Sequence, residues 1–379
     1  MTKVLHVMYH MGRGGAETWL MHVLRNIDRD EYRMDFVVQT ESKGTFDDEI
    51  RALGSEVFKC LGARRPWTFA ANFLHILRQH GPYDIIHSHI HDYSGIVLLL
   101  ARWAGVPHRI AHCHSDLSSV RKEASVLRTV YSTVARSLIR RYATNGFGCS
   151  GPASADLFGS NWAQDSRWQV LHCGIDVTPY QVPDSATNDS SELRRQLGLN
   201  DDDFVMGHVG RFVHSKNHAF LIALTAECVR REPRTRLVLV GDGGLRAAVE
   251  QAVAAKGLSD RVILTGVRSD VARLLTEVFD VFVMPSLHEG LPVALIEAQA
   301  AGVPCVISDA ISKEAAAVIP LVRALSLRAP IDSWAEAVLS ACTTPRPVTR
   351  KEALELITSS SFNIHNCVSK LKSAYGRRQ

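Results

Sequence analysis

The sequence predicts an α/β protein with two doubly wound, Rossmann-like domains that face a central cleft. Short β-branched or apolar runs alternate with amphipathic stretches along the chain, which is typical of parallel sheets covered by helices. A stretch rich in Pro, Asp, Ser, Thr and Asn, between residues 182 and 200, interrupts this alternation before it starts again. Sheets of this kind bind ligands at the C-terminal ends of their strands, so we expect the ligand site in the cleft.

The first half contains strand-like runs separated by stretches with apolar residues at helical spacing. We expect strands near 4–9, 34–39, 55–59, 84–89, 108–113, 145–149 and 168–172. We expect helices at 16–26, 69–80 and 94–104, and a long basic helix from about 119 to 141.

The second half has the same architecture without repeating the sequence. Its expected strands are 204–209, 236–240, 262–265, 281–284 and 304–308, and its expected helices are 217–231, 245–256, 271–277 and 292–301. The sequence therefore predicts one domain over 1–182, a second over 183–361, and a terminal helix over 362–379 that packs back on the first domain.

Composition excludes several classes of protein. With 46% hydrophobic and 22% charged residues among 379, the chain is globular and long enough for two cores. A net charge of +4 is too small to indicate a nucleic-acid partner. The eight cysteines form no C-x-x-C pair, which fits reduced thiols in a cytoplasmic protein. The N-terminus has no signal-peptide pattern, so we expect a cytoplasmic protein.

Two glutamates eight residues apart, Glu289 and Glu297, stand on either side of an expected helix start. Gly290 permits the turn, and Pro292 suits the first position of the helix. The exposed backbone N–H groups of a helix N-terminus attract phosphate. Carboxylates on both sides could hold hydroxyl-rich groups attached to that phosphate, as in a nucleotide-sugar. The alternative is an N-terminal carboxylate that favours the helix dipole and one solvated glutamate.

Two cations precede this motif. Arg211 follows the expected strand 204–209, and Lys216 stands just before the next helix. An arginine fork and a lysine point charge suit diphosphate oxygens, although solvated loop cations would have the same pattern. A tight turn at 241–244 and the loop at 266–270, which contains Val267 and could line a base pocket, follow two further strands.

Together, Gly210-Arg211, Lys216-Asn217, Gly241-Asp242-Gly243 and the glutamate motif resemble the retaining nucleotide-sugar glycosyltransferases of family 4, which have the GT-B fold. The similarity covers nearly the whole chain. Between residues 311 and 327 the chain lacks the Gly-rich run of many family members, so it looks closer to the branch that builds exopolysaccharide or capsule. The resemblance implies that Arg211 and Lys216 bind the donor diphosphate. It also implies that Glu289 holds the hydroxyls of the donor sugar and that Glu297 binds the ribose.

In this family, backbone amides after the first glutamate also contact phosphate. Pro292 has no N–H and cannot contribute. The backbone N–H groups that would contact the phosphate therefore belong to its neighbours Gly290, Leu291, Val293 and Ala294. No cofactor and no metal ion are expected, since Arg211 and Lys216 would neutralise the phosphates.

The loop that opens the first helix lacks the third glycine of a dinucleotide fingerprint, because Glu17 stands there. It resembles the Gly-Gly loop of the family, in which Gly14 would approach the acceptor and Gly15 the donor. A plain helix-start turn is the alternative.

Histidines are dense at two strand ends, at 87–91 and 112–114. Their order differs from known zinc hydrolase motifs and no acidic ligand set follows, so we do not predict a metal site. The family has a histidine after the second of these strands, near the reacting sugar. We assign this role to His114, with His112 as the near alternative and His89 as a further candidate on the acceptor side.

The expected long helix is basic, and a second basic, aromatic spot stands at 64–67. A solvated face explains this pattern, but so does a patch that docks anionic lipid head groups and brings the enzyme to a lipid-linked acceptor.

The motifs and the family resemblance together lead us to expect a retaining hexosyltransferase that uses a nucleotide-sugar donor and a saccharide or lipid-linked acceptor. We expect it in the cytoplasm or at the inner membrane face. A nucleotide-sugar epimerase, a metal-dependent hydrolase and a sugar-binding protein are the alternatives.

Overall fold

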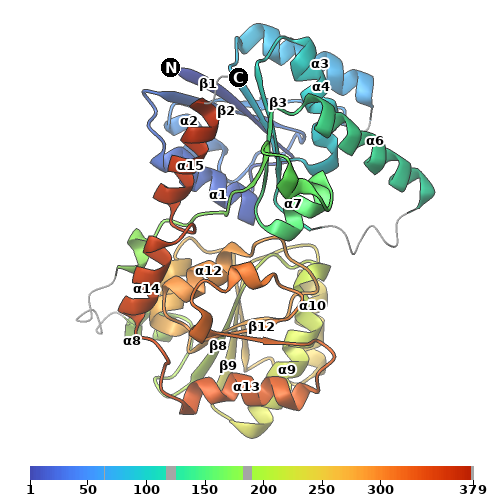
Figure 1. Cartoon of the computed structure of the whole chain (residues 1–379). Coiled ribbons are helices and arrows are strands. Elements are labelled where there is room, and N and C mark those ends of the chain that lie inside the picture. The colour runs from blue at the N-terminus through green and yellow to red at the C-terminus, as the bar shows by residue number, and fades with distance from the viewer. Residues whose placement is uncertain (64, 117–124, 182–189, 377–379) are drawn as a thin grey trace. The chain divides into compact units, whose positions relative to one another are not determined.

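Two parallel β-sheets organise the chain, one in each of two units (Figure 1). The computed structural model describes residues 1–63, 65–116, 125–181 and 190–376. The first unit comprises Met1–Gly174 and Ile364–Gln379, and the second comprises Ile175–Asn363. The expected α/β class with two doubly wound domains is confirmed. The boundary expected from the sequence falls at 182, in a stretch of which 182–189 lies outside the described residues.

The first unit contains a seven-stranded sheet in the order β3-β2-β1-β4-β5-β6-β7, with every pairing parallel. Its strands are β1 (Thr2–Met8), β2 (Tyr32–Val38), β3 (Val57–Lys59), β4 (Ile85–Ser88), β5 (His108–Cys113), β6 (Asn145–Gly148) and β7 (Trp168–Val170). Its helices are α1 (Gly15–Asn26), α2 (Asp47–Ala52), α3 (Pro66–His80), α4 (Ser94–Trp103), α6 (Val126–Tyr142), α7 (Gly151–Phe158) and α15 (Ile364–Gly376). The strand order reverses between β1 and β4, which is where doubly wound sheets gather their functional loops.

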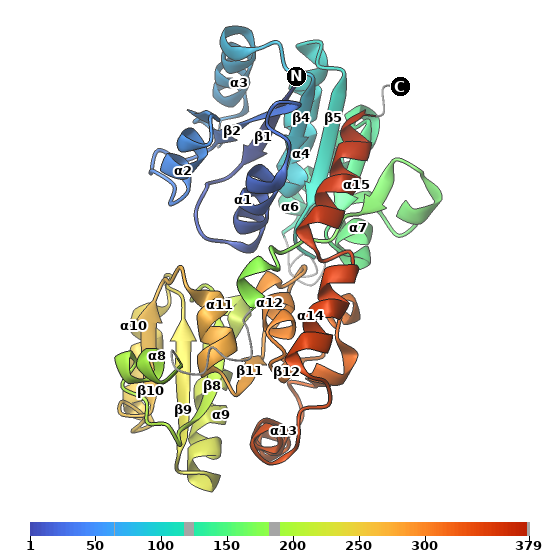
Figure 2. The ribbon, with the colours of Figure 1, turned by 90° about the vertical axis from the view of Figure 1, so that its left-hand side faces the viewer.

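The terminal helix α15 packs beside α1 in this unit (Figure 2). The Trp19 indole N–H of α1 donates to the Cys367 sulfur at 3.2 Å, and the Lys370 ammonium donates to the Val170 carbonyl at 2.6 Å. Residues separated by most of the chain therefore share one core.

The second unit contains a six-stranded parallel sheet in the order β10-β9-β8-β11-β12-β13. Its strands are β8 (Phe204–Val209), β9 (Thr235–Val240), β10 (Val262–Gly266), β11 (Val281–Met284), β12 (Cys305–Ser308) and β13 (Val322–Leu325). Its helices are α8 (Ser190–Gln196), α9 (His218–Arg231), α10 (Arg246–Ala255), α11 (Val271–Arg273), α12 (Val293–Ala300), α13 (Ile331–Thr343) and α14 (Arg350–Ser359). Fully buried Phe212, Leu221 and Trp334 belong to its core.

Three local expectations differ from the structure. The helix expected at 292–301 begins one residue later, because Pro292 is the N-cap of α12, with φ −75° and ψ 102°. The helix expected at 271–277 is a short α11 followed by a π-helical turn, Leu274–Val278. The described part of the long basic helix begins at Val126, since 117–124, which hold Arg121 and Lys122, lie outside the described residues. None of the described helices is long and apolar enough to cross a bilayer.

Candidate functional site

The C-terminal ends of four strands in the second unit meet at one edge of the sheet. The Gly241 N–H, after β9, donates to the Gly266 carbonyl at 2.9 Å, and the Phe212 N–H donates to the Asp242 carbonyl at 2.9 Å. Gly241 has φ +136°, and a Cβ there would lie 2.0 Å from the Gly210 carbonyl oxygen. Only glycine fits such a position, so the turn packs directly against the end of β8.

Lys216 and Glu289 form an ion pair at this edge. The Lys216 ammonium lies 2.6 Å from the Glu289 carboxylate, and their side chains are only 16% and 13% exposed. Two further contacts hold the loops together, because the Leu287 N–H donates to the Ser215 carbonyl at 2.8 Å and the Asn217 amide donates to the Pro285 carbonyl at 3.1 Å. The structure thus brings together two residues that are 73 positions apart.

Arg211 and Val267 lie on the loops that follow β8 and β10 of the same sheet. Arg211 directly follows Gly210, where an added Cβ would lie 3.2 Å from Cε of Lys216, so the lysine stem crosses the end of β8 beside Arg211. Both Arg211 and Val267 are exposed. The edge therefore presents two cations, one carboxylate and an exposed apolar side chain.

Helix α12 starts next to Glu289. The Leu295 N–H donates to the Pro292 carbonyl at 3.0 Å, whereas the N–H groups of Val293 and Ala294 come before this first N–H that donates within the helix. The Leu291 and Val293 side chains are buried, and Gly290 is buried with them. The backbone donors that are expected to meet phosphate thus stand at a fixed helix end, with its positive dipole.

Glu297 lies further along α12 and contacts Tyr180. Burial raises the pKa of Glu297 to about 7, although a hydrogen bond from the Tyr180 hydroxyl acts in the opposite direction. Burial, and then the neighbouring Glu297, raise the pKa of Tyr180 well above its usual value. Sequence reasoning misses Tyr180 because it precedes Glu297 by 117 positions and belongs to no recognisable pattern.

The first unit holds the acceptor-side candidates Gly14, His89 and His112, together with Gly15, which is expected on the donor side, and His114, the expected catalytic histidine. Gly14 is the N-cap of α1 in an extended conformation, and Gly15 is its first residue, after the loop that follows β1. Trp19, one turn further, lies over the histidines, with ring-centroid distances of 5.0 Å to His112 and 5.4 Å to His114. The glycine loop and the histidine cluster are therefore joined through α1.

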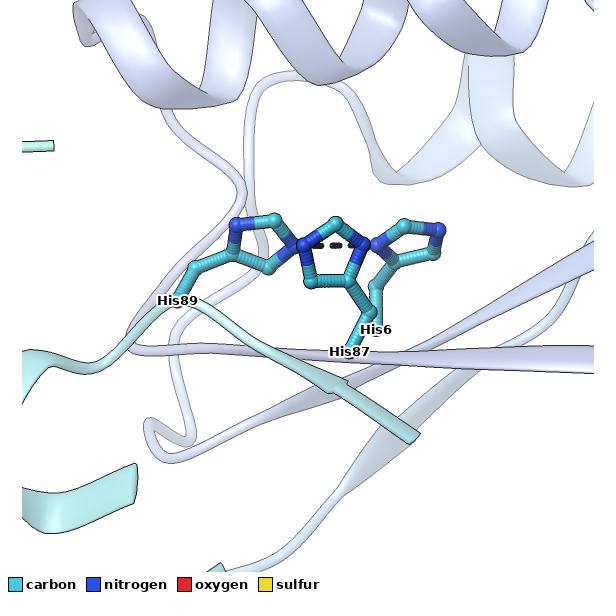
Figure 3. Close-up of side chains that lie close together, drawn as sticks. All are labelled: His6, His87 and His89. Atoms are coloured by element: carbon cyan, nitrogen blue, oxygen red, sulfur yellow. Dashed lines mark hydrogen bonds between the residues drawn. The ribbon is translucent and has the colours of Figure 1, made fainter. Parts of the chain in front are cut away.

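Five histidines of β1, β4, β5 and the segments after them form two separate series of hydrogen bonds. The dashed line in Figure 3 marks the bond between His6 and His89, whose Nδ1 and Nε2 atoms lie 3.0 Å apart, and His89 Nδ1 lies 2.9 Å from His114 Nε2. His112 Nδ1 lies 3.2 Å from His87 Nε2, and His87 Nδ1 lies 2.8 Å from the Tyr375 hydroxyl. Among the described residues, the buried Nε2 atoms of His6 and His112 have no partner.

Burial keeps these imidazoles neutral. It lowers the pKa of His6 and of His114 to about 3, and the pKa values of His87, His89 and His112 lie well below the ordinary value for the same reason. His114 has both ring nitrogens engaged, since Nδ1 lies 3.7 Å from the Cys173 sulfur. That contact is weak, so Nδ1 is the nitrogen that a ligand can recruit at least cost.

Three groups of described side chains could hold a metal ion: His6, His87 and His89; His89, His112 and His114; and His91, Cys113 and Asp156. In the first group, His6 Nδ1 and His89 Nε2 already form a hydrogen bond with each other. In the third, His91 is paired with Asp156 and Asp92 at 3.1 Å each. Burial alone would lower the pKa of His91, but hydrogen bonds to Asp156, Asp92 and Cys113 raise it to about 11. A protonated imidazole is no metal ligand.

The chain matches known glycosyltransferases over its whole length. Residues 13–178 match the model of Glycosyltransferase Family 4, and residues 189–354 match that of Glycosyl transferases group 1. EpsF of Bacillus subtilis, named as a glycosyltransferase, is 36% identical over 98% of this chain and 96% of its own. CapH of Staphylococcus aureus, named as a capsular polysaccharide biosynthesis glycosyltransferase, is 25% identical over 99% of both chains.

Solved structures have the same fold. HepE of Anabaena, crystallised with UDP and glucose, superposes with a TM-score of 0.80 at 22% identity, and the match covers 99% of both chains. The two parallel sheets, the glutamate motif and the full-length relatives agree with one another. The chain therefore belongs to the family 4 glycosyltransferases, which have the GT-B fold.

Proposed function

We propose that this enzyme transfers a hexosyl group from a nucleoside diphosphate to an acceptor hydroxyl, with retention of the anomeric configuration. The observation that carries the proposal is the Lys216–Glu289 pair, 2.6 Å apart, beside the N-terminus of α12. A cation, a carboxylate and a helix end at one place match the diphosphate and the sugar of such a donor. HepE, which has the same fold, forms crystals with UDP and glucose, and this agrees with a donor of this kind.

Each side chain of the donor site has a role in this proposal. Arg211 and Lys216 bind the diphosphate together with the N–H groups near the start of α12, and Val267 lines the base pocket. Glu297 accepts hydrogen bonds from the ribose hydroxyls, and Glu289 from the donor sugar.

The proposed transfer step depends on the charges that surround the diphosphate. The acceptor oxygen bonds to the anomeric carbon as the bond to the diphosphate breaks, and a diphosphate oxygen takes the acceptor proton. Fixed cations stabilise the negative charge that develops on the leaving group, so the reaction needs no divalent metal. His114 donates to the reacting sugar through Nδ1, which gives up only its weak contact with Cys173.

The names of relatives support the proposed acceptor class. CapH is named for capsular polysaccharide biosynthesis, and the named relative from Escherichia coli acts on a diphosphoundecaprenol-linked sugar. We place this enzyme in the assembly of a polysaccharide or glycolipid, with a saccharide or lipid-linked acceptor.

The test is a thermal-shift screen with UDP-, GDP- and ADP-sugars, followed by transfer assays with the donor that stabilises the protein. We expect one donor to stabilise the protein and to be consumed only with acceptor, equally well in EDTA. Conversion of the donor without acceptor would instead indicate an epimerase. Loss of activity in EDTA, restored by zinc, would contradict the metal-free mechanism.

A further inference from the structure

Three histidines of the first unit form one series of hydrogen bonds that leads from the core to the proposed sugar contact. His6 lies on β1, His89 follows β4, and His114 follows β5. His6 Nδ1 bonds His89 Nε2 at 3.0 Å, and His89 Nδ1 bonds His114 Nε2 at 2.9 Å. The remaining nitrogen of His6 is buried and has no partner among the described residues, whereas that of His114 lies 3.7 Å from the Cys173 sulfur.

Both hydrogen bonds of this series are well aligned. The ring centroids of His6 and His89 lie 5.3 Å apart, and those of His89 and His114 lie 5.1 Å apart, with interplanar angles of 20° and 30°. Each separation is little more than the N···N distance plus the radii of two imidazole rings. The bonds therefore run nearly in the plane of the rings, which is where the N–H groups and the nitrogen lone pairs point.

Each of the three imidazoles is neutral and carries one N–H. Burial lowers the pKa of His6 and of His114 to about 3, and it lowers the pKa of His89 well below its usual value. A neutral imidazole has one nitrogen that donates and one that accepts. Because a bond between two such rings needs a proton on one of the two facing nitrogens, the tautomer of each ring determines that of the next.

Only two arrangements of the three protons satisfy both bonds. In the outward arrangement all three protons lie on Nδ1, so His6 donates to His89, His89 donates to His114, and the His114 N–H points away from the series. In the inward arrangement all three lie on Nε2, and the buried N–H of His6 has no acceptor among the described residues.

The two ends of the series favour the outward arrangement. At its buried end, that arrangement leaves a lone pair of His6 without a partner, whereas the inward arrangement leaves an N–H without one. An unpaired N–H is the rarer defect in protein interiors. At the other end, the Cys173 thiol is a weak donor and a weak acceptor, so it favours neither arrangement.

We propose that His89 is a positioning residue that keeps the proton of His114 on Nδ1, so that this N–H is presented to the donor sugar. His6 supports His89 in the same way from within the core. The inference rests on the proposed function, in which His114 donates to the reacting sugar through Nδ1. It gives His89 a role that is exerted through His114, in place of the direct acceptor contact expected from the sequence.

A second series of histidines serves as the comparison. His112 Nδ1 bonds His87 Nε2 at 3.2 Å, and His87 Nδ1 bonds the Tyr375 hydroxyl of α15 at 2.8 Å. The bonded nitrogens of both histidines are used within this series, so it does not determine the tautomer of His114. Removal of a hydrogen bond here tests whether any loss in the histidine cluster has the same effect.

The first measurement is a long-range proton–nitrogen NMR spectrum of the full chain labelled with nitrogen-15 histidine. Its cross-peak pattern distinguishes a protonated ring nitrogen from a bare one, and His114→Gln assigns the His114 signals by their loss. We expect the Nδ1–H tautomer for His6, His89 and His114 in the wild type without nucleotide. An Nε2–H tautomer of His114 would overturn the proposal, and this result needs neither a variant that folds nor a substrate.

Two substitutions of His89 separate the roles of its nitrogens, because an asparagine amide reaches the position of Nδ1 and a glutamine amide that of Nε2. His89→Asn should keep the bond to His114, its Nδ1–H tautomer, and a kcat within about threefold of the wild type. His89→Gln should change the tautomer and lower kcat about 10- to 100-fold, with the nucleotide-sugar selected by the thermal-shift screen as donor. The Kd for UDP should stay unchanged in both, because UDP carries no sugar.

Tyr375→Phe is the matched control, since it removes one hydrogen bond from the second series and leaves His114 bonded to His89. It should change neither the His114 tautomer nor kcat. Equal losses of kcat in His89→Asn and His89→Gln, with the wild-type tautomer in both, would overturn the positioning role. A changed tautomer in His89→Gln at wild-type kcat would instead contradict the sugar contact of the proposed function.

Discussion

Lys216 and Glu289 neutralise each other, with 2.6 Å between ammonium and carboxylate. Two charges this far removed from water are stable only as a pair, because either alone would lose solvation. If Lys216 binds the donor diphosphate as we propose, we expect the diphosphate to replace the carboxylate as its partner. We expect Glu289 then to turn toward the hydroxyls of the donor sugar.

Lys216→Ala should weaken donor binding. A charge-assisted hydrogen bond contributes about 1.5–3 kcal/mol, so we expect the Kd for UDP to rise about 10- to 100-fold in titration calorimetry. Lys256→Ala, which removes an exposed lysine after α10, is the control and should bind UDP normally. An unchanged Kd in Lys216→Ala would remove the lysine from the donor site.

Glu289→Gln should separate binding from chemistry. The amide cannot pair with Lys216 as a charge, so the lysine is free for phosphate and UDP should bind as tightly as before or tighter. Transfer should fall about 100-fold or more, because one electrostatic partner of the reacting sugar is gone. Steady-state kinetics and UDP titration on the same preparation measure both. Weaker UDP binding with normal kcat would be the opposite of this expectation.

Glu297 should make stability decrease as pH rises. Its pKa is about 7 in the folded protein and near 4.5 in the unfolded chain, so between these values the folded state binds more protons. The stability contributed by protonation is present below about pH 4.5 and is lost as pH rises through 7, by roughly 3 kcal/mol. Urea unfolding at about pH 5 and pH 8 should show a smaller difference in Glu297→Gln than in the wild type. If the unfolding free energies of the two proteins depended on pH in the same way, the Glu297 carboxyl would be hydrated in the folded protein.

The five buried histidines at the strand ends should make the first unit unfold in acid. The five imidazoles have lowered pKa values when folded, so the unfolded chain binds more protons below about pH 6.5. Each group then removes about 1.4 kcal/mol of stability per pH unit. Far-UV circular dichroism across an acid titration should show His6→Phe unfolding at lower pH than the wild type, with His75→Gln, an exposed histidine on α3, unchanged. If His6→Phe unfolded at the same pH as the wild type, the His6 imidazole would already be protonated in the folded protein.

The fold could be predicted because it follows from local rules, since alternating strand and helix patterns indicate parallel sheets. Strand ends at one edge of such a sheet also place Lys216 and Glu289 in one region, but their ion pair was not predicted. No helix was expected between β12 and the terminal helix, although α13 has buried residues at helical spacing, including Trp334, Ala335 and Val338.

Two features of the candidate site could not be predicted. Nothing near Tyr180 marks it as a partner of Glu297, since only tertiary folding brings them together. The hydrogen bonds of His114 to His89 and Cys173 depend likewise on side-chain orientation, which a strand pattern does not specify. Local periodicity predicts which side of a helix or strand is buried. The hydrogen-bond partner of a buried polar atom depends instead on how all the elements pack together.

The contact between Trp19 and Cys367 has a consequence for synthesis on the ribosome. Residues 1–174 emerge before the second unit, but α15, which contacts Trp19 through Cys367 and His87 through Tyr375, emerges after it. The contiguous stretch Ile175–Asn363 can complete its own core first. A nascent chain would therefore finish its second unit before its first, and the early residues would wait with an apolar surface that chaperones can recognise.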